Sequence, residues 1–571
     1  MSTAGRHPVR RGQRVRVRET EAEQKASNRK KNFVVQGSLL AIAGILVRII
    51  GMVYRVPLTA IIGAEGNGYY TSAFSIYSLL LILSSYSMPT AISRIVSGNL
   101  AKGRYRNTER VLRAAFVYAT GIGAVMFSVL WFGGSAIADL LQKPYCAFAL
   151  KALAPTVWIM AYLGILRGYF QGTGDMVPTA ISQILEQVLN AVISVLAAYI
   201  LFHKGETANL LYSDTEYTYA FGAAGGCIGT GAGALTALLF FIMLYLSHRP
   251  QLRRHVRRDE SGVDDYRKIA TVLALTMVPI LISSTVYNIS SVIDDYLFGN
   301  VQAYLGRAKN IVTEWGIFGE YHILFNIPVA LANALSSSLI PSLTRAVEEK
   351  NRRDTVSRVR YSIRFTMLIA IPATIGLCVL AEPVSRMLFP GKNVVLLINL
   401  TRVGALAVVF YSLSTISNAI LQGLGHLNVP LKNAVIALIL HVLALLGMMF
   451  AGLGIYAVVL SNILFALVMC ILNQRAIRRH ARCRIELGKV FGLPTFAGLV
   501  MGAAAYAVYF GISSVLPESM RLGRIGCAVS VLPAVLAAIL VYFGVLLLLH
   551  AFTREDLDNM PMGGRLKHFV R

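Results

Sequence analysis

The chain has 571 residues, of which 56% are hydrophobic and only 14% are charged, and its mean hydropathy is +0.61. A water-soluble protein of this length needs a larger charged surface, so the composition excludes a soluble protein and predicts an integral membrane protein. The net charge of +26 does not indicate nucleic-acid binding, because the basic residues lie between apolar segments and not in a separate basic domain.

The chain begins with a basic stretch, residues 1–33, that has no apolar core. The apolar segment after it is too long for a signal peptide and has no clear cleavage site, so we interpret it as the first membrane helix. The composition of the basic stretch predicts a disordered cytoplasmic tail, and its charge predicts contact with anionic lipid head groups.

Fourteen apolar segments follow, each close to the roughly 20 residues that a helix needs to cross a bilayer. Because backbone polar groups in lipid must be paired within their own segment, we expect an all-α membrane protein with about 14 transmembrane helices. The segments lie near residues 34–60, 68–97, 108–133, 146–170, 177–202, 219–247, 268–298, 318–345, 359–382, 394–421, 429–450, 453–474, 489–515 and 526–551.

The distribution of Lys and Arg predicts the orientation in the membrane. Basic residues crowd alternate loops, whereas the intervening loop 203–217 is poor in Lys and Arg. Cytoplasmic loops carry an excess of basic residues, so both termini should be cytoplasmic in a multi-pass protein of the bacterial plasma membrane. The basic segments are the N-terminal tail and residues 102–110, 248–260, 348–360 and 473–484.

One short phrase occurs twice. "YFQGTGDMVP" begins at Tyr169 and "ILQGLGHLNVP" begins at Ile420, in the loops after the fourth and tenth predicted helices. A second pattern, "SMPTAISR" and "SLIPSLTR" before a basic segment, recurs at the same offset of six helices. Because six is even, this repeat predicts two lobes of equal orientation, related by a pseudo-two-fold axis along the membrane normal. The alternative is that glycine- and proline-containing loops simply look alike.

The repeat defines the domains that we expect. Its turns, which we interpret as an inner gate, contain Gln171, Gly172 and Gly174 in one lobe and Gln422, Gly423 and Gly425 in the other. The expected ranges are 1–33 for the tail, 34–247 for a six-helix N-lobe, 248–267 for a basic linker, 268–474 for a six-helix C-lobe, 475–488 for a basic loop, 489–552 for two further helices and 553–571 for a cytoplasmic tail.

The fifth predicted helix carries a polar stripe. Thr179, Gln183, Glu186, Asn190 and Ser194 are spaced four, three, four and four residues apart, so they share one helix face. Lipid cannot satisfy such a face, which must contact protein or a water-filled cavity. Small polar residues often join two helices, and we interpret Thr179, Asn190 and Ser194 in that way first. For Glu186, whose charge is costlier to bury, we favour a role in a cavity, with Gln183 and Asn190 beside it.

Three arginines lie within predicted helices. Arg48 and Arg55 are seven residues apart, which is two helical turns, so they share a face. Guanidinium groups bind phosphate oxygens bidentately, and the pair therefore predicts a site for an anionic ligand. The alternative for Arg55 is a position near the outer end, with its head group in the interface. Arg402 is either a third cation of the cavity or a residue of the outer interface.

Two further helices carry ionisable side chains. Asp294 and Asp295 lie near the outer end of the seventh predicted helix, where they are either hydrated at the interface or able to bind a proton or a cation. His322 and Asn326 are four residues apart on the eighth, and a histidine near a helix end is more often structural than functional.

No catalytic motif accompanies these residues. The sequence has no Walker loop and no dinucleotide-binding glycine pattern, and its six cysteines show no Cys-x-x-Cys spacing. We therefore expect a transporter and not an enzyme, with no metal site and no cofactor.

Several segments resemble a known family. "RIIGMVYRVPLTAIIGAEGNGYY", "MPTAISRIVS", "RGYFQGTGDMVPTAISQILEQV" and "AILQGLGHLNVPLKNAV" resemble the polysaccharide-biosynthesis branch of the multidrug/oligosaccharidyl-lipid/polysaccharide (MOP) exporter superfamily. The likeness is greatest to SpoVB-type and MurJ-type proteins of Gram-positive bacteria, and it covers roughly residues 33–550.

The resemblance implies a central cationic cavity between two six-helix lobes, and two additional helices that form a groove for a polyprenyl tail. Arg48 and Arg55 match the two first-helix arginines of the MurJ-type cavity, with one more residue between them. The second-helix arginine of the family has no match here, and its eighth-helix arginine is replaced near His322. Asp294 or Asp295 is the candidate counterpart of a seventh-helix acid that binds a cation in the family.

The resemblance also implies a function. We expect a flippase that moves an undecaprenyl-pyrophosphate-linked cell-envelope precursor, first of all lipid II for peptidoglycan or spore cortex, from the inner to the outer leaflet by alternating access. Coupling would come from Na⁺, H⁺ or the membrane potential, and the partners would be the lipid-linked glycan, the bilayer and the cell-wall synthesis machinery. The alternatives are a flippase for lipid-linked O-antigen or teichoic-type polysaccharide, a multidrug or cation antiporter of the same fold, and an envelope scaffold.

Overall fold

The computed structural model describes residues 40, 42–391, 393–483 and 486–549. Within these ranges the regular secondary structure is helical and contains no strand. The predictions for the tails, 1–33 and 553–571, concern residues that lie outside the described ranges.

The helices follow one another through short connections. The first half contains Ile42–Val53, α2 (Arg55–Leu81), the π-helix Ile82–Tyr86, α3 (Met88–Ala101), α4 (Tyr105–Leu140), α5 (Cys146–Gly172), α6 (Val177–Tyr212), α7 (Tyr217–Arg258) and α8 (Tyr266–Tyr304). The second half contains the 3₁₀ turn Ala308–Asn310, α9 (Ile311–Glu348), α10 (Arg352–Val379), α11 (Ala381–Leu388), α12 (Val394–Gly404), α13 (Leu406–Gly423), α14 (Asn428–Phe450), α15 (Ile455–Ala481), the π-helix Gly488–Gly492, α16 (Leu493–Val515), α17 (Glu518–Arg521) and α18 (Arg524–Leu548).

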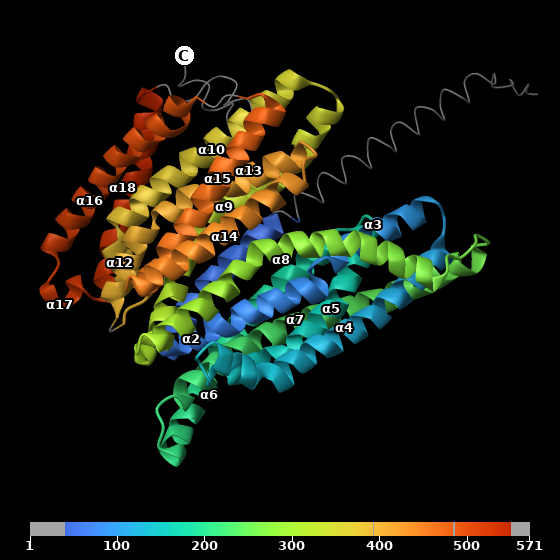
Figure 1. Ribbon diagram of the computed structural model, residues 1–571, viewed down its shortest axis with the longest axis horizontal. Coiled ribbons are helices and arrows are strands. Elements are labelled where there is room, and N and C mark those ends of the chain that lie inside the picture. The colour runs from blue at the N-terminus through green and yellow to red at the C-terminus, as the bar shows by residue number, and fades with distance from the viewer. Residues whose placement is uncertain (1–39, 41, 392, 484–485, 550–571) are drawn as a thin grey trace, which may run out of the picture.

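The helices form two groups, which we call the first lobe (α2–α7) and the second lobe (α9–α15). Figure 1 shows α3–α7 gathered in one half of the molecule and α9–α15 in the other, with α16 and α18 at the edge of the second lobe. Helix α8 contacts both lobes, and α2 packs against α9 where the lobes meet. Buried apolar side chains form separate cores within the lobes, as expected when each lobe is a packed bundle.

Eleven of the described helical segments are long and apolar enough to cross a membrane. This number confirms a multi-pass helical protein, whereas the count of 14 helices and the pseudo-two-fold relation between lobes stay predictions. The helices are also longer than the apolar segments. α6 continues to Tyr212 and α7 to Arg258, so most of the predicted loop 203–217 and the start of the linker 248–267 are helical.

The predicted loop between the first two spans is also helical. Helical structure continues from Arg55 to Leu81, interrupted at Gly63, whose φ of 69° and ψ of −177° only glycine adopts readily. The glycine-rich segment after Gly63 resembles a loop in sequence, yet it forms a helix because Gly68 and Gly316 let α2 and α9 approach closely. A Cβ at either position would overlap the backbone of the opposite helix.

The two repeated turns have the same backbone geometry. Gly174 and Gly425 both adopt a left-handed conformation, with φ of 89° and 84°. In each turn the amide of the next residue donates to a carbonyl five residues back, from Asp175 to Phe170 and from His426 to Leu421. This hydrogen bond ends the helix and requires the left-handed residue that glycine supplies. The sequence echo therefore corresponds to two equivalent helix ends.

Candidate functional site

A cavity of about 410 Å³ lies where the two lobes meet. Its walls come from the helix Ile42–Val53, α2, α5, α6, α7 and α9, so both lobes contribute. Aromatic and aliphatic side chains line part of it, including Tyr54, Phe74 and Tyr77. The ionisable and amide side chains that line it are Arg55, Glu186, Gln187, Asn190, His322 and Asn326.

Arg55 is the cation of this cavity. Its guanidinium lies 5.4 Å from the ring centres of both Tyr70 and Phe74, within the range of cation–π attraction. The hydroxyls of Tyr54 and Tyr70 are hydrogen-bonded to each other at 3.2 Å beside it. Among the described residues no carboxylate forms an ion pair with Arg55. Its charge is therefore available to a ligand.

Glu186 is paired with an arginine that sequence reasoning did not select. Arg167 of α5 donates from Nη2 to Glu186 Oε2 at 2.6 Å and contacts Ser182 Oγ at 3.3 Å. The two side chains are only 11% and 22% exposed, so each neutralises the other where hydration is poor. Arg167 stands directly before the first repeated turn, and its position inside an apolar segment was the signal that could have found it.

Arg48 lies elsewhere. It is exposed, it is absent from the cavity lining, and its Nη1 donates to the carbonyl of Ala330 in α9 at 3.2 Å. Only Arg55 of the two first-helix arginines lines the cavity. The backbone is helical at Tyr54, whose amide donates to Ile50 and whose carbonyl accepts from Leu58, so Arg48 lies two turns before Arg55 along a continuous helix. Arg402 is also outside the cavity lining. It is 49% exposed on α12, and its Nη2 lies 3.9 Å from Glu382.

The remaining residues of the polar stripe join helices. Ser194 Oγ lies 2.8 Å from Asn190 Oδ1 and 2.7 Å from the carbonyl of Gly226 in α7, and its hydroxyl hydrogen can be donated to either. Thr230 of α7 donates to Asn190 at 3.4 Å. Asn190 thus holds α6 against α7 and also reaches the cavity. Gln183 does not line it, and its buried Oε1 has no hydrogen-bond partner among the described residues.

His322 and Asn326 line the cavity from α9. The Asn326 amide lies 2.8 Å from His322 Nδ1, and the imidazole packs against the rings of Phe318 and Phe325. The ring is exposed on the cavity side. The histidine therefore faces the same space as Arg55, from the opposite lobe.

Asp294 and Asp295 are not hydrated at an interface, since they are 2% and 0% exposed. Asp294 accepts from Asn462 at 2.9 Å and lies 2.6 Å from His441 Nε2, so it joins α8 to α14 and α15. Adjacent residues on a helix point in different directions, and Asp295 turns to the first lobe. Neither carboxylate lines the central cavity, and no described group of three acidic, His or Cys residues could hold a metal ion.

A buried ion pair joins the first lobe to α8. Lys143, in the loop between α4 and α5, donates to Asp295 at 2.5 Å and to Ser72 at 2.8 Å, and it lies 4.6 Å from the Trp315 ring centre. Nearby, Asn67 of α2 donates to the carbonyl of Gly316 in α9 at 2.6 Å. We call these contacts the inter-lobe seal, because they join the first lobe to α8 and α9.

The repeated turns make close packing contacts. A Cβ on Gly172 would lie 2.8 Å from Val96 Cβ, and a Cβ on Gly423 would lie 2.9 Å from Leu343. Each turn therefore brings one helix end against its neighbour, α5 against α3 and α13 against α9. The role of Gln171 and Gln422 in an inner gate stays a prediction.

The sequence matches three family models. The model described as polysaccharide biosynthesis protein matches residues 34–300, a second model of the same description matches residues 392–516, and the MatE model matches residues 322–445. The chain is thus related to the polysaccharide-biosynthesis and MatE families, and its structural neighbours include transporters of the MOP superfamily. It is thus a multi-pass membrane transporter.

Individual MOP proteins align along most of the chain. Stage V sporulation protein B of Bacillus subtilis (strain 168) is 24% identical over 550 residues, covering 94% of this chain and 99% of that protein. Lipid II flippase MurJ of the same strain is 25% identical over 471 residues, covering 78% and 82%. A solved structure titled lipid II flippase MurJ, inward closed conformation, has a TM-score of 0.65 at 14% identity and covers 90% of this chain and 98% of that one. At that identity the structural likeness concerns the fold.

Proposed function

We propose that this protein is a flippase that carries a lipid-linked pyrophosphate glycan, lipid II first of all, from the inner to the outer leaflet. The observation that carries the proposal is the charge of the central cavity. Arg55 is left without an acidic partner among the described residues, whereas Arg167 neutralises Glu186. The net positive charge suits a pyrophosphate, and a guanidinium can bind two phosphate oxygens at once.

This cavity answers the main energetic problem of flipping. Moving a pyrophosphate through hydrocarbon is prohibitive because an unpaired charge there loses its hydration. A polar cavity between two lobes replaces part of that hydration as the lobes move. An inside-negative potential contributes about 2.3 kcal/mol per charge per 100 mV, hence about 4.6 kcal/mol for two charges moving outwards. No metal or bound cofactor is required by this scheme.

The position of the inter-lobe seal supports alternating access from the inner to the outer leaflet. The basic loops predict that the ends of α3 and α15 face the cytoplasm. On that orientation the seal lies on the outer side and the repeated turns lie on the inner side. The cavity would then receive its ligand from the cytoplasmic leaflet.

The test is complementation of a bacterial strain that lacks its own lipid II flippase. We expect Arg55→Ala to abolish growth at matched protein levels, and Arg55→Lys to recover little, because an ammonium lacks the bidentate fork. Arg402→Ala is the matched control, since this arginine lies outside the cavity lining, and it should retain growth. Full growth with Arg55→Ala would contradict the anion site.

A second measurement identifies the cargo. Depletion of the protein in its own host should lead to accumulation of one undecaprenyl-linked precursor on the inner side. Accumulation of lipid II supports the proposal as stated. Accumulation of another lipid-linked glycan would identify that glycan as the cargo instead. Normal levels of all precursors, together with altered drug resistance, would instead favour an antiporter.

The orientation has its own test. Single cysteines replacing Ala208, in the extension of α6, and Val256, in the extension of α7, should react from opposite sides of the membrane with an impermeant thiol reagent. Reaction of the cysteine at position 256 from outside the cell would reverse the assignment.

A further inference from the structure

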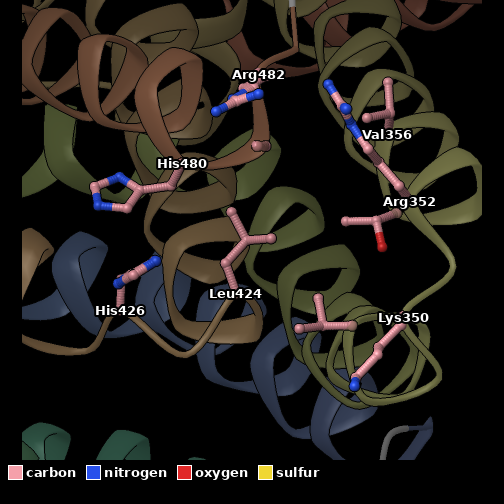
Figure 2. A pocket seen from close by; sticks show the side chains of 10 residues that line it. Lys350, Arg352, Val356, Leu424, His426, His480 and Arg482 are labelled. Carbon is pink, nitrogen blue, oxygen red and sulfur yellow. The ribbon is translucent and has the colours of Figure 1, made fainter.

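A second cavity, which shares no lining residue with the central one, is lined by basic side chains. It measures about 390 Å³ and lies between the α9–α10 turn, the α13–α14 turn and the end of α15. Its floor includes Val356 and Leu424, and Figure 2 shows the basic side chains arranged around Leu424. The basic residues that line it are Lys350, Arg352, His426, His480 and Arg482.

The charges of this pocket are not balanced by acids. Among the described residues no carboxylate forms an ion pair with Lys350, Arg352 or Arg482. The acidic residues nearby are engaged with other cations, Glu349 with Arg345 at 2.8 Å and Asp354 with Arg358 at 2.9 Å. Glu486 is paired with Lys489 at 2.8 Å in the same way, and the exposed Glu348 does not line the pocket.

The corresponding region of the first lobe, at the α3–α4 turn and the end of α7, contains acidic partners for its basic residues. There, Arg104 and Lys268 both reach Asp264, at 3.3 Å and 2.9 Å, and Asp259 accepts from the backbone amide of Arg106 at 2.7 Å. The first lobe thus supplies its own anions at this level, and the pocket of the second lobe does not. Among the described residues at this level, the basic pocket of the second lobe therefore lacks the acidic partners that the first lobe provides for Arg104 and Lys268.

Two of the basic residues also have an unfavourable backbone conformation. Lys350 and Arg482 have φ of 54° and 48°, a left-handed region in which glycine is preferred. Retaining a long cationic side chain there costs stability that glycine would not. The His426 and His480 rings are only 3.9 Å apart, and burial together with this neighbour lowers the pKa of His426 below its usual value. An anion in the pocket would offset the repulsion among its neighbouring basic side chains.

We infer that this pocket binds a phosphate-bearing anion, most simply the head group of an anionic phospholipid. The pocket lies at the ends of α10, α13, α14 and α15, four helices long and apolar enough to span a membrane, which places it at the level of lipid head groups. Basic pockets between membrane helices on the cytoplasmic side suit such head groups. A bound phosphate would connect α9, α10 and α15. Because α9 also carries His322 and Asn326, the pocket and the central cavity share a helix.

The strained residues provide a variant that separates binding from folding. Replacing Lys350 and Arg482 together by glycine removes two charges from the pocket and relieves the backbone strain at both positions. The folded protein should therefore be as stable as the parent, or more so, in neutral lipid. The matched control is Ser213→Gly, which relieves the same kind of strain at φ 52°, at the end of α6 and outside the pocket.

The measurement is made on the full chain in nanodiscs of phosphatidylcholine, with and without phosphatidylglycerol, and with inorganic phosphate as a third condition. Phosphatidylglycerol should raise the melting temperature of the parent and of Ser213→Gly, whereas the double glycine variant should lose most of this increase. Native mass spectrometry should show one retained phosphatidylglycerol fewer in the double variant. The affinity of the double glycine variant for that lipid should be roughly 30-fold lower than that of the parent, because each substitution removes the attraction of one basic side chain for the anionic head group.

The three conditions also separate the sources of phosphate. If only phosphatidylglycerol raises the melting temperature, the pocket binds a lipid head group. If inorganic phosphate raises the melting temperature equally, the pocket binds a soluble anion. Equal increases for the parent and the double glycine variant, with equal numbers of retained lipids, would overturn the inference. Each result is independent of whether the central cavity carries lipid II.

Discussion

The ion pair between Lys143 and Asp295 should control how often the inter-lobe seal opens. Its side chains are 0% and 1% exposed. Asp295→Asn would leave the Lys143 ammonium buried without its counter-ion, and breaking a buried pair in this way costs about 3–5 kcal/mol. Because the pair joins the first lobe to α8, most of that cost falls on the sealed state. The ratio of sealed to open molecules should therefore fall by up to roughly 150- to 5,000-fold.

A native cysteine reports on this opening. Cys146 lies three residues after Lys143, is fully buried, and its thiol donates to the Tyr69 carbonyl at 3.4 Å. In a variant whose other cysteines are replaced, Cys146 should react slowly with an impermeant thiol reagent. Asp295→Asn should raise the reaction rate strongly, and adding Lys143→Met should restore protection, because the Met and Asn side chains leave no unpaired charge buried.

The neighbouring acid provides the control. Asp294 is also buried, but its partners His441 and Asn462 both lie in the second lobe. Asp294→Asn should therefore destabilise that lobe without exposing Cys146. The argument from burial is refuted if Cys146 reacts no faster in Asp295→Asn than in the parent. It is also refuted if Cys146 reacts equally fast in Asp294→Asn, because the ion pair would then not hold the lobes together.

Three further predictions concern other parts of the molecule. Arg167→Ala should lower stability in detergent by about 3–5 kcal/mol, because Glu186 loses its counter-ion, and the added change Glu186→Gln should recover part of the loss. Gly172→Ala should lower the unfolding temperature more than Gly425→Ala, since overpacking against α3 costs about 1–3 kcal/mol whereas left-handed strain costs about 1–2 kcal/mol. Hydrogen bonds from backbone and side chain hold the pKa of Asp259 at about 2, so docking of the α7–α8 connection should persist at neutral pH and weaken only as the pH falls below 4 towards 2, measured by hydrogen exchange of that segment.

Much of the architecture could be predicted from the sequence because a membrane constrains local structure strongly. Apolar segments must be helical in lipid, so composition and segment length predict the class of the protein and the approximate place of each helix. The repeated Gln-Gly-x-Gly phrases also predict equivalent turns, since the left-handed glycines Gly174 and Gly425 serve a purely local hydrogen-bond pattern. Helix lengths were less predictable, because α6 and α7 extend beyond their apolar segments.

The partners of the polar residues were decided only by the tertiary structure. Helical periodicity places Glu186 on a polar face but does not say which helix lies opposite, and it is α5 that supplies Arg167. In the same way, a two-turn spacing suggested that Arg48 and Arg55 act together, yet only Arg55 lines the cavity, whereas Arg48 donates to the Ala330 carbonyl of α9. Asp294 and Asp295 are adjacent in the chain and are bound to opposite lobes. Each outcome depends on how whole helices are rotated and stacked, which is determined by packing between segments far apart in the sequence.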